Sequence, residues 1–289
     1  MYPAPFQYSA PTTIDETVTL LAELGDEGRV LAGGQSLLPM MKLRLAAPAH
    51  LVDINGVDGL SDITANGHLS IGALVRHADV VDDPTVAQAS PLVAATAKWV
   101  ADPLVRNRGT VCGSIAHCDP EGDWNSVMLA LGAEVVARGP SGERIIPIGD
   151  FVVDFFTNSL QTGEMVTGVR IPVADSRTGG AYLKLERKIG DYATVGVATH
   201  LRLGEDGKIA EAGIGLTSVG SKNLKATDAE ALLVGNEPSD AVFAEAAAAA
   251  AAASDPASDV RGPAEYKRSV VKAYVERGLA RCMSQIREG

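Results

Sequence analysis

Two short stretches of the chain combine glycines with hydroxyl side chains, a pattern that favours phosphate binding. The first glycine segment, residues 32–36, reads Ala32-Gly33-Gly34-Gln35-Ser36, and the second, residues 110–114, reads Thr110-Val111-Cys112-Gly113-Ser114. Glycines let the backbone approach a ligand closely, and the N–H groups beside them bind anions. Neither segment is a G-x-G-x-x-G fingerprint or a P-loop. Alone, each is also typical of a Gly-rich connection, but together they indicate one long ligand held from two sides.

Acidic side chains follow the second glycine segment. Asp119 and Asp123 can accept hydrogen bonds from sugar hydroxyls, so the combination suits a nucleotide cofactor. Asp123 could equally cap the helix expected after it. Cys112, His117 and Cys118 lie close together, but a tetrahedral metal site needs four ligands and no other Cys/His pair is nearby. We therefore interpret His117 as a loop histidine bonded to backbone and expect no metal ligands in this chain.

Composition narrows the function classes. The chain has 289 residues, of which 46% are hydrophobic and 21% charged, as in ordinary globular proteins. The net charge of −11 argues against nucleic-acid binding, which needs a basic surface. No apolar run reaches the ~20 residues of a membrane span, and the first six residues lack the pattern of a signal peptide. Three scattered cysteines fit a reducing cytoplasm.

The elements that must position these residues can be read from periodicity and turn signals. Thr12 and Thr13 precede acids and predict a helix start, with an apolar pattern that ends near Gly25. Residues 37–43 are compatible with either a helix or an extended segment. The expected strands are 29–32, 51–54, 69–73, 134–137, 144–147 and 164–172, and the expected helices are 74–81, 92–100 and 127–131.

A polar stretch, residues 173–180, predicts a flexible boundary between two domains. Beyond it, residues 182–188, 194–203 and 209–217 predict three strands with hairpin spacing. Residues 244–253 form an alanine-rich run that predicts a helix. Pro263 opens the last helix, on which Tyr266, Val271 and Leu279 share one expected core face with their neighbours.

The two glycine segments resemble the paired FAD-binding motifs of the flavoprotein subunit of molybdenum hydroxylases. Residues 184–194, 214–217 and 258–266 share the resemblance, which covers essentially the whole chain. Within the family, the chain is most similar to medium subunits of the aerobic carbon monoxide dehydrogenase type. Sister enzymes that oxidise nicotine, xanthine or aldehydes use similar flavin subunits.

The resemblance implies an α+β fold. Residues 1–175 would form a two-subdomain FAD-binding fold of the vanillyl-alcohol-oxidase type, with subdomains of about 1–56 and 57–175. Residues 180–289 would form the C-terminal domain of the flavoprotein subunit, a three-stranded antiparallel sheet with helices.

The resemblance also implies roles for single residues. Both glycine segments would hold FAD, Asp123 would lie near the sugar or ribityl chain, Lys184 near the cofactor, and Tyr192 over the flavin ring. Cys112 is a departure, because the family more often has Gly-Gly at 112 and 113. A side chain at 112 restricts the backbone conformations open to that residue.

The function implied is electron transfer by an oxidoreductase subunit. Electrons would pass from the molybdenum cofactor of a large partner subunit and two [2Fe-2S] clusters of a small one, through FAD, to quinone or another acceptor. Aerobic oxidation of carbon monoxide to carbon dioxide is the expected reaction, with a nicotine, xanthine or aldehyde dehydrogenase as the alternative. A dimer of heterotrimers is the expected assembly, and any membrane association would be peripheral, through the partners. A self-contained FAD oxidase and a non-redox nucleotide-binding module are less favoured.

Overall fold

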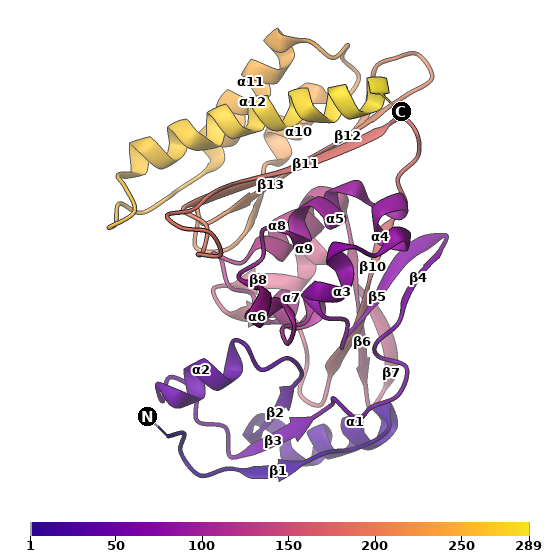
Figure 1. The fold of residues 1–289 in the computed structure, drawn as a ribbon, viewed down its shortest axis with the longest axis vertical. Helices are drawn as coiled ribbons and strands as arrows, with labels where there is room; N and C mark the ends of the chain where they lie inside the picture. Colours follow the sequence, from indigo (N-terminus) through magenta and orange to yellow (C-terminus); the bar gives the residue numbers. More distant parts are fainter. Residues whose placement is uncertain (1, 289) are drawn as a thin grey trace.

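The computed structural model describes residues 2–288 and arranges them as three stacked layers (Figure 1). The N-terminal layer contains a three-stranded sheet, the middle layer a five-stranded sheet with seven helices, and the C-terminal layer a four-stranded sheet with three helices. A two-stranded ribbon lies beside the middle layer. The layers follow one another in chain order along the long axis of the molecule.

The N-terminal layer is a parallel sheet in the order β1-β3-β2. Helix α1 begins with a capping box, in which Thr13 and Glu16 each satisfy the other's backbone N–H, as the hydroxyl and acids there predict. Residues 37–42 are helical, which settles the alternative left open by the sequence. The elements are β1 (Gln7–Ser9), α1 (Ile14–Leu24), η1 (Gly25–Glu27), β2 (Gly28–Leu31), α2 (Leu37–Lys42) and β3 (His50–Asp53).

The middle layer is an antiparallel sheet in the order β4-β5-β10-β6-β7. The predicted hairpin is present, with Gly139 opposite Gly142 at its turn. Strand β4 was not predicted, because three of its four residues are exposed and carry no apolar alternation. The strands are β4 (Ile63–Asn66), β5 (His68–Gly72), β6 (Glu134–Gly139), β7 (Gly142–Pro147) and β10 (Met165–Pro172), and the ribbon is β8 (Val152–Asp154) with β9 (Thr157–Asn158).

The helices of the middle layer include four that the sequence did not predict, at residues 84–89, 103–106, 111–117 and 148–151. Residues 111–117 form α7, whereas the Gly113-containing stretch was interpreted as a loop. Thr110 starts this helix by accepting a hydrogen bond from the Gly113 N–H at 3.1 Å. The helices are α3 (His77–Val81), α4 (Pro84–Ala89), α5 (Pro91–Ala97), α6 (Pro103–Arg106), α7 (Val111–His117), α8 (Asp123–Leu131) and α9 (Ile148–Phe151).

The C-terminal layer is an antiparallel sheet in the order β11-β12-β13-β14. Its three long strands match the predicted ones, and the short β14 adds a fourth that was not expected. Strand β11 begins at Thr178, inside the stretch expected to be flexible. The elements are β11 (Thr178–Leu185), β12 (Val195–Leu203), β13 (Ile209–Thr217), β14 (Leu224–Lys225), α10 (Thr227–Leu233), α11 (Asp240–Ala253) and α12 (Ala264–Glu288).

Helix α12 lies across the outer face of this sheet (Figure 1). Val271 and Leu279 are buried there as expected, but Tyr266 is 48% exposed and the expectation that it belongs to the core is wrong. Tyr266 lies in the first turn of α12, where the helix extends past the sheet toward the turn that precedes it.

Helix α8 connects the middle and C-terminal layers, since all nine of its residues are buried. On β13, a Cβ added at Gly213 or Gly215 would meet the α8 backbone at Ala130 or Ser126. The glycines therefore let strand and helix backbones touch without side chains between them. Ser126 and Thr217 also share a hydroxyl hydrogen bond of 2.5 Å across this contact.

Candidate functional site

The two glycine segments meet in space, although they lie far apart in the chain. Gly33 is buried, and a Cβ added to it would meet the carbonyl oxygen of Arg108 and, at 2.7 Å, the Cα of Gly109. Gly109 in turn packs on the ring of His77. Glycine is therefore required at 33 for contact between the segments, a purpose that the sequence did not reveal.

A chain of hydrogen bonds ties the two segments together. Asn55 donates to the carbonyl of Ala32 in the first segment at 2.9 Å. Arg76 donates to the Asn55 side chain at 2.5 Å and to the carbonyl of Arg108, just before the second segment, at 2.6 Å. Arg76 thereby bridges the approaches to both segments with one planar guanidinium group.

The first segment offers backbone groups suited to an anion. Gly34 has φ +71°, a left-handed conformation characteristic of anion-binding turns. Gln35 is exposed and Ser36 half-buried, and both lead directly into α2.

In the second segment, the side chain of Cys112 points into the core. Its thiol lies 3.5 Å from the carbonyl oxygen of Ile71 and 3.7 Å from that of Gly72, and the residue is 1% exposed. Cys112 lies in the first turn of α7, where N–H groups have no acceptor within the helix. The side chain therefore leaves the backbone face of the segment open, with Gly113 exposed and Ser114 half-buried beside it.

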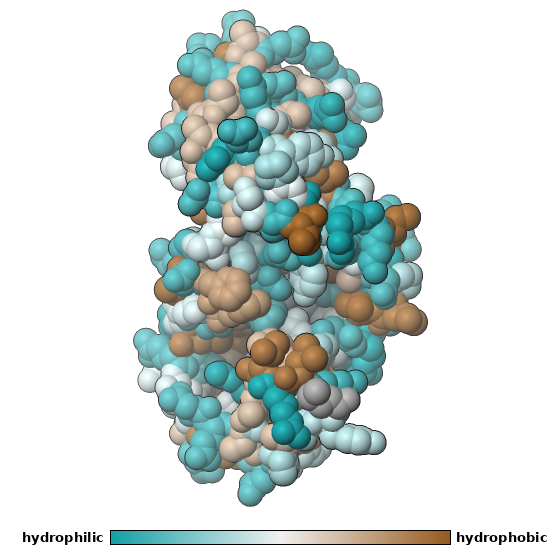
Figure 2. Space-filling model, turned by 90° about the vertical axis from the view of Figure 1, so that its left-hand side faces the viewer, coloured by the Kyte–Doolittle hydropathy of each residue, from teal (hydrophilic) through white to brown (hydrophobic). Residues whose placement is uncertain are grey.

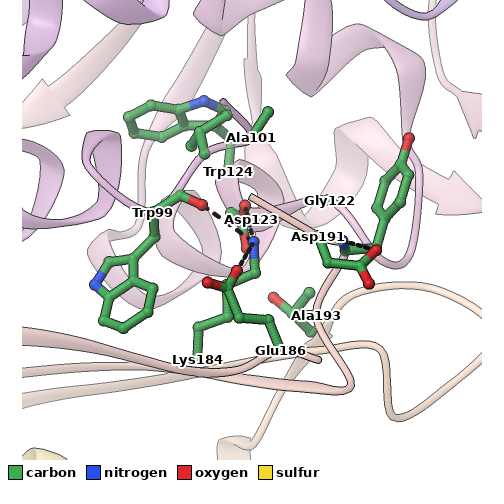
Figure 3. A network of polar contacts seen from close by, with 12 residues as sticks. Trp99, Ala101, Gly122, Asp123, Trp124, Lys184, Glu186, Asp191 and Ala193 are labelled. Atoms are coloured by element: carbon green, nitrogen blue, oxygen red, sulfur yellow. Dashed lines mark hydrogen bonds and ion pairs between the residues drawn. The ribbon is translucent and has the colours of Figure 1, made fainter. Parts of the chain in front are cut away.

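Asp123 and Lys184, both predicted near the cofactor, bind each other (Figure 3). The Lys184 ammonium lies 3.0 Å from one Asp123 oxygen, 3.7 Å from Glu186 and 3.1 Å from the Trp99 carbonyl. The other Asp123 oxygen accepts from the Tyr182 hydroxyl at 2.5 Å. The side chains of Lys184 and Asp123 are 1% and 7% exposed. Asp123 is the first residue of α8 and does not cap it through its side chain.

The network joins α8 of the middle layer to β11 of the C-terminal layer. A buried charge is costly unless it is paired and hydrogen-bonded, and here each charge has several partners. The arrangement fixes the position of the loop that follows β11, which carries Asp191 and Ala193 on the far side of the network in Figure 3.

Tyr192 lies in that loop, half-exposed, with its backbone N–H bonded to Asp191 at 2.9 Å. Partial burial raises the pKa of Tyr192 to about 12, with the charges of Asp119 and Glu121 and a hydrogen bond to Asp119 adding to the effect. The phenol is therefore neutral near pH 7 and lies within reach of the charges of Asp119 and Glu121, which follow the second glycine segment in the chain. Gly190, at φ +83°, brings the loop against the backbone of Ala101.

The face carrying these segments is hollowed and partly apolar (Figure 2). Hydrophobic residues gather over its middle and lower parts, while its upper part is mostly hydrophilic. A separate cavity of about 290 Å³ lies where β10 leads into β11, and none of its lining residues is among the predicted cofactor-binding residues.

Within residues 2–288, no three His, Cys, Asp or Glu side chains are grouped so that they could hold a metal ion. In the same part of the chain, no helix has the length and apolarity needed to cross a membrane.

The sequence missed Asn55, Arg76 and Arg261, which hold the site together. Arg261 contacts Glu121 and the Ala193 carbonyl from the turn before α12. None of the three forms a local pattern with its neighbours. The only signal was that Arg261 lies in residues 258–266, a stretch that shares the family resemblance without a role.

Comparisons with known proteins match both halves of the chain. Residues 4–174 match a family described as the FAD binding domain in molybdopterin dehydrogenase, and residues 180–282 match the CO dehydrogenase flavoprotein C-terminal domain. The carbon monoxide dehydrogenase medium chain of Hydrogenophaga pseudoflava is 40% identical over 98% of this chain and 100% of its own. Subunit alpha of the 6-hydroxypseudooxynicotine dehydrogenase complex of Paenarthrobacter nicotinovorans is 38% identical over 99% of this chain and 97% of its own.

Solved structures give the same result. A chain of carbon monoxide dehydrogenase from Hydrogenophaga pseudoflava, in a form lacking the Mo-pyranopterin moiety, superposes with a TM-score of 0.95 at 41% identity, covering 99% of both chains. A chain of quinoline 2-oxidoreductase from Pseudomonas putida 86 gives a TM-score of 0.91 at 33% identity, again covering 99% of both. With both halves of the chain matched and relatives aligned from end to end, this protein belongs to the family of FAD-binding medium subunits of carbon monoxide dehydrogenase-type molybdenum hydroxylases.

Proposed function

We propose that this chain holds one FAD across the two glycine segments and relays electrons within a carbon monoxide dehydrogenase-type molybdenum hydroxylase. The observation that carries the proposal is the contact of Gly33 with the backbone at Gly109, which brings together two hydroxyl-bearing segments that each reach the surface at one residue, Gln35 or Gly113. FAD, when bound, supplies the uptake and release of electrons, and the protein supplies binding and electrostatics.

Different residues contact different parts of FAD. Residues Ala32, Gly33, Gly34, Gln35 and Ser36 lie on one side of the diphosphate and residues Thr110, Val111, Cys112, Gly113 and Ser114 on the other, with the half-buried Ser36 and Ser114 hydroxyls able to donate to it. Tyr192 covers the flavin ring, which its half-exposed position beside Asp119 supports. Asp123 and Lys184 are buried and bind each other. We therefore assign them an indirect role near the cofactor, in which they fix the loop that carries Tyr192.

The finer description of the fold belongs to this proposal. We assign residues 1–175 to a FAD-binding domain of the vanillyl-alcohol-oxidase type, with subdomains of about 1–56 and 57–175, and residues 180–289 to a C-terminal domain. Separate sheets in the three layers support all three parts, and the two hydrophobic clusters support the boundary between the FAD-binding domain and the C-terminal domain.

The metals belong to the proposed partners. A large subunit holds the molybdenum cofactor, a small subunit holds two [2Fe-2S] clusters, and the assembly is a dimer of heterotrimers. The terms medium chain and subunit, used for relatives that align from end to end with this chain, support such partners. We place the complex in the cytoplasm, because the three cysteines are free and buried.

Oxidation of carbon monoxide to carbon dioxide is the proposed reaction of the whole enzyme, with quinone or another acceptor receiving the electrons. The alternative is a dehydrogenase of a nitrogen heterocycle or an aldehyde. It is favoured by the 6-hydroxypseudooxynicotine dehydrogenase subunit, which is nearly as similar as the carbon monoxide dehydrogenase medium chain. Native mass analysis of the purified complex identifies the partner subunits and so bears directly on this choice.

Glycine substitutions test the FAD assignment. Gly33→Ala puts a methyl group into the Arg108 carbonyl, and Gly34→Leu adds a bulky side chain at a positive φ, so we expect both variants to lose flavin. Gly149→Ala in α9 is the control, because a Cβ there meets nothing. The measurement is the visible absorption that dithionite bleaches. Wild-type flavin content in both variants would rule out the proposed site, and wild-type protein without flavin would favour a non-redox module.

A further inference from the structure

The stretch 258–266 forms a braced turn between α11 and α12. Asp259 and Gly262 exchange backbone hydrogen bonds of 3.2 and 3.1 Å, with Gly262 at φ +146°. The buried ammonium of Lys267 lies 2.8 Å from the Asp259 carboxylate and donates to the Ala257 carbonyl at 2.9 Å. The turn is therefore anchored to the first turns of α12 and has a fixed shape.

Arg261 extends from this turn to two other segments. Its Nη1 donates to Glu121 at 2.8 Å and to the carbonyl of Ala193 at 3.2 Å. The side chain is only 15% exposed, and its own N–H bonds to the Asp259 carboxylate at 2.8 Å. Because its backbone is held, the arginine loses little conformational entropy when its guanidinium forms hydrogen bonds.

Both targets of Arg261 adjoin Tyr192. Ala193 follows Tyr192 directly, so the bond to its carbonyl fixes the backbone at the base of the tyrosine. Glu121 lies two residues after Asp119, its N–H bonds to the Asp119 carboxylate at 2.9 Å, and the charges of both acids act on the Tyr192 hydroxyl. One guanidinium group thus fixes the backbone beside Tyr192 and one of the two acids whose charges the tyrosine meets.

We propose that Arg261 is a positioning residue for Tyr192, holding the half-exposed tyrosine at a set place beside residues 119–121. The inference rests on the proposed function, in which Tyr192 covers the flavin. Its consequence is that the turn before α12, although outside both glycine segments, controls how acceptors reach the flavin ring.

The test uses the purified, assembled complex with Arg261→Met, Arg261→Lys and Tyr192→Ala. Arg268→Met is the matched control, since Arg268 bonds to Ser254 and Asp255 and does not contact the Tyr192 loop. Three quantities are compared: quenching of flavin fluorescence by iodide, flavin reduction by substrate, and reoxidation by quinone. We expect Arg261→Met to change iodide quenching and reoxidation by roughly threefold to tenfold, the range for the net loss of one ordinary hydrogen bond, with reduction by substrate little changed. Arg261→Lys should restore part of the effect, because one ammonium can replace one donor nitrogen.

A double variant asks whether Arg261 acts through Tyr192. If it does, adding Arg261→Met to Tyr192→Ala changes quenching and reoxidation no further, because coupled residues are not additive. Fully additive effects, or an Arg261→Met complex that behaves like Arg268→Met, would overturn the inference.

Two outcomes separate this inference from the proposed function. If Tyr192→Ala alone leaves quenching and both rates unchanged, the covering role of Tyr192 fails and the inference fails with it. If Tyr192→Ala has its effect but Arg261→Met has none, only the inference fails. Should Arg261→Met lose stability or flavin, Glu121→Gln decides instead, since it keeps the shape of Glu121 and removes the charge that Arg261 meets. An effect on reoxidation supports the inference, and wild-type behaviour rejects it.

Discussion

The thiol of Cys112 illustrates how one buried side chain can leave its own backbone available. Burial raises the pKa of Cys112 to about 12, so only about one molecule in ten thousand carries the reactive thiolate near pH 8. We therefore predict that iodoacetamide alkylates Cys112 very slowly in the folded protein and rapidly in urea. Mass analysis of the labelled peptide measures both rates. Fast, stoichiometric labelling of the folded protein would show that the thiol is reactive after all.

His77 makes the stability of the protein dependent on pH. Its Nδ1 accepts from Trp124 at 3.1 Å, and burial, with the charges of Arg106 and Arg76, lowers its pKa from 6.5 to about 4. The unfolded chain binds the extra proton between these values, so stability is full above about pH 6.5 and is lost as the pH falls toward 4.

The loss expected from His77 is roughly 3 kcal/mol in the free energy of unfolding. Urea unfolding of wild type and His77→Gln, near neutral pH and near pH 4.5, measures it. The variant should show a smaller decrease between the two conditions, and the same substitution at half-buried His50 controls for the loss of a histidine. Equal decreases in wild type and His77→Gln would contradict the prediction.

At the scale of single residues, the sequence identified the glycine segments but not their supports. Spacing revealed Gly33, Gly34, Gly113 and the hydroxyls because each motif is local. The pairing of Asp123 with Lys184 joins residues 61 positions apart, and no periodicity reports such a contact. The resemblance pointed to both residues, and the structure adds that they are buried and bind each other.

Among the elements, the connection between β2, β3 and α3 holds the two glycine segments at a fixed separation. Arg76 precedes α3, and its two hydrogen bonds are the side-chain link between the segments. We predict that Arg76→Met weakens FAD binding roughly tenfold to a hundredfold, because two charge-assisted hydrogen bonds are lost. Fluorescence titration of flavin-depleted complex measures the affinity. Arg138→Met, which removes an exposed ion pair with Asp15, is the control. Equal affinities for FAD in the two variants would contradict the proposed role of Arg76.

Elements with strong periodic patterns were predicted well. Helix α1 has its capping box, and β12 and β13 are each rich in apolar residues, with five consecutive buried positions, so each was predicted to within a few residues. Short elements such as β1, β4 and β14 were missed, because their residues are largely exposed and tertiary pairing alone makes them strands. Helix α7 was missed because Gly113 disfavours helix locally, while the Thr110 cap and the packing of Val111, Cys112 and Ile115 override it.

For the molecule as a whole, we predict a strict division of labour. Because the proposed molybdenum cofactor belongs to a partner subunit, the chain alone, supplied with FAD, should not oxidise carbon monoxide or a heterocycle. Its bound flavin should still be reduced by an artificial donor such as dithionite. Turnover assays on the separated chain and on the complete complex measure the difference. Substrate turnover by the separated chain without molybdenum would overturn the electron-relay assignment.

The contact between β13 and α8 has a consequence for how the protein can be divided. A helix buried on every side cannot be returned to water without exposing apolar surface. Helix α8 is such a helix, and Gly213 and Gly215 seat the C-terminal sheet directly on its backbone. The boundary near residue 175 therefore separates two parts of the chain but does not separate two independently stable units. Fragments cut there would expose the contact between α8 and the C-terminal sheet, so the two parts of the intact chain should melt in a single cooperative transition.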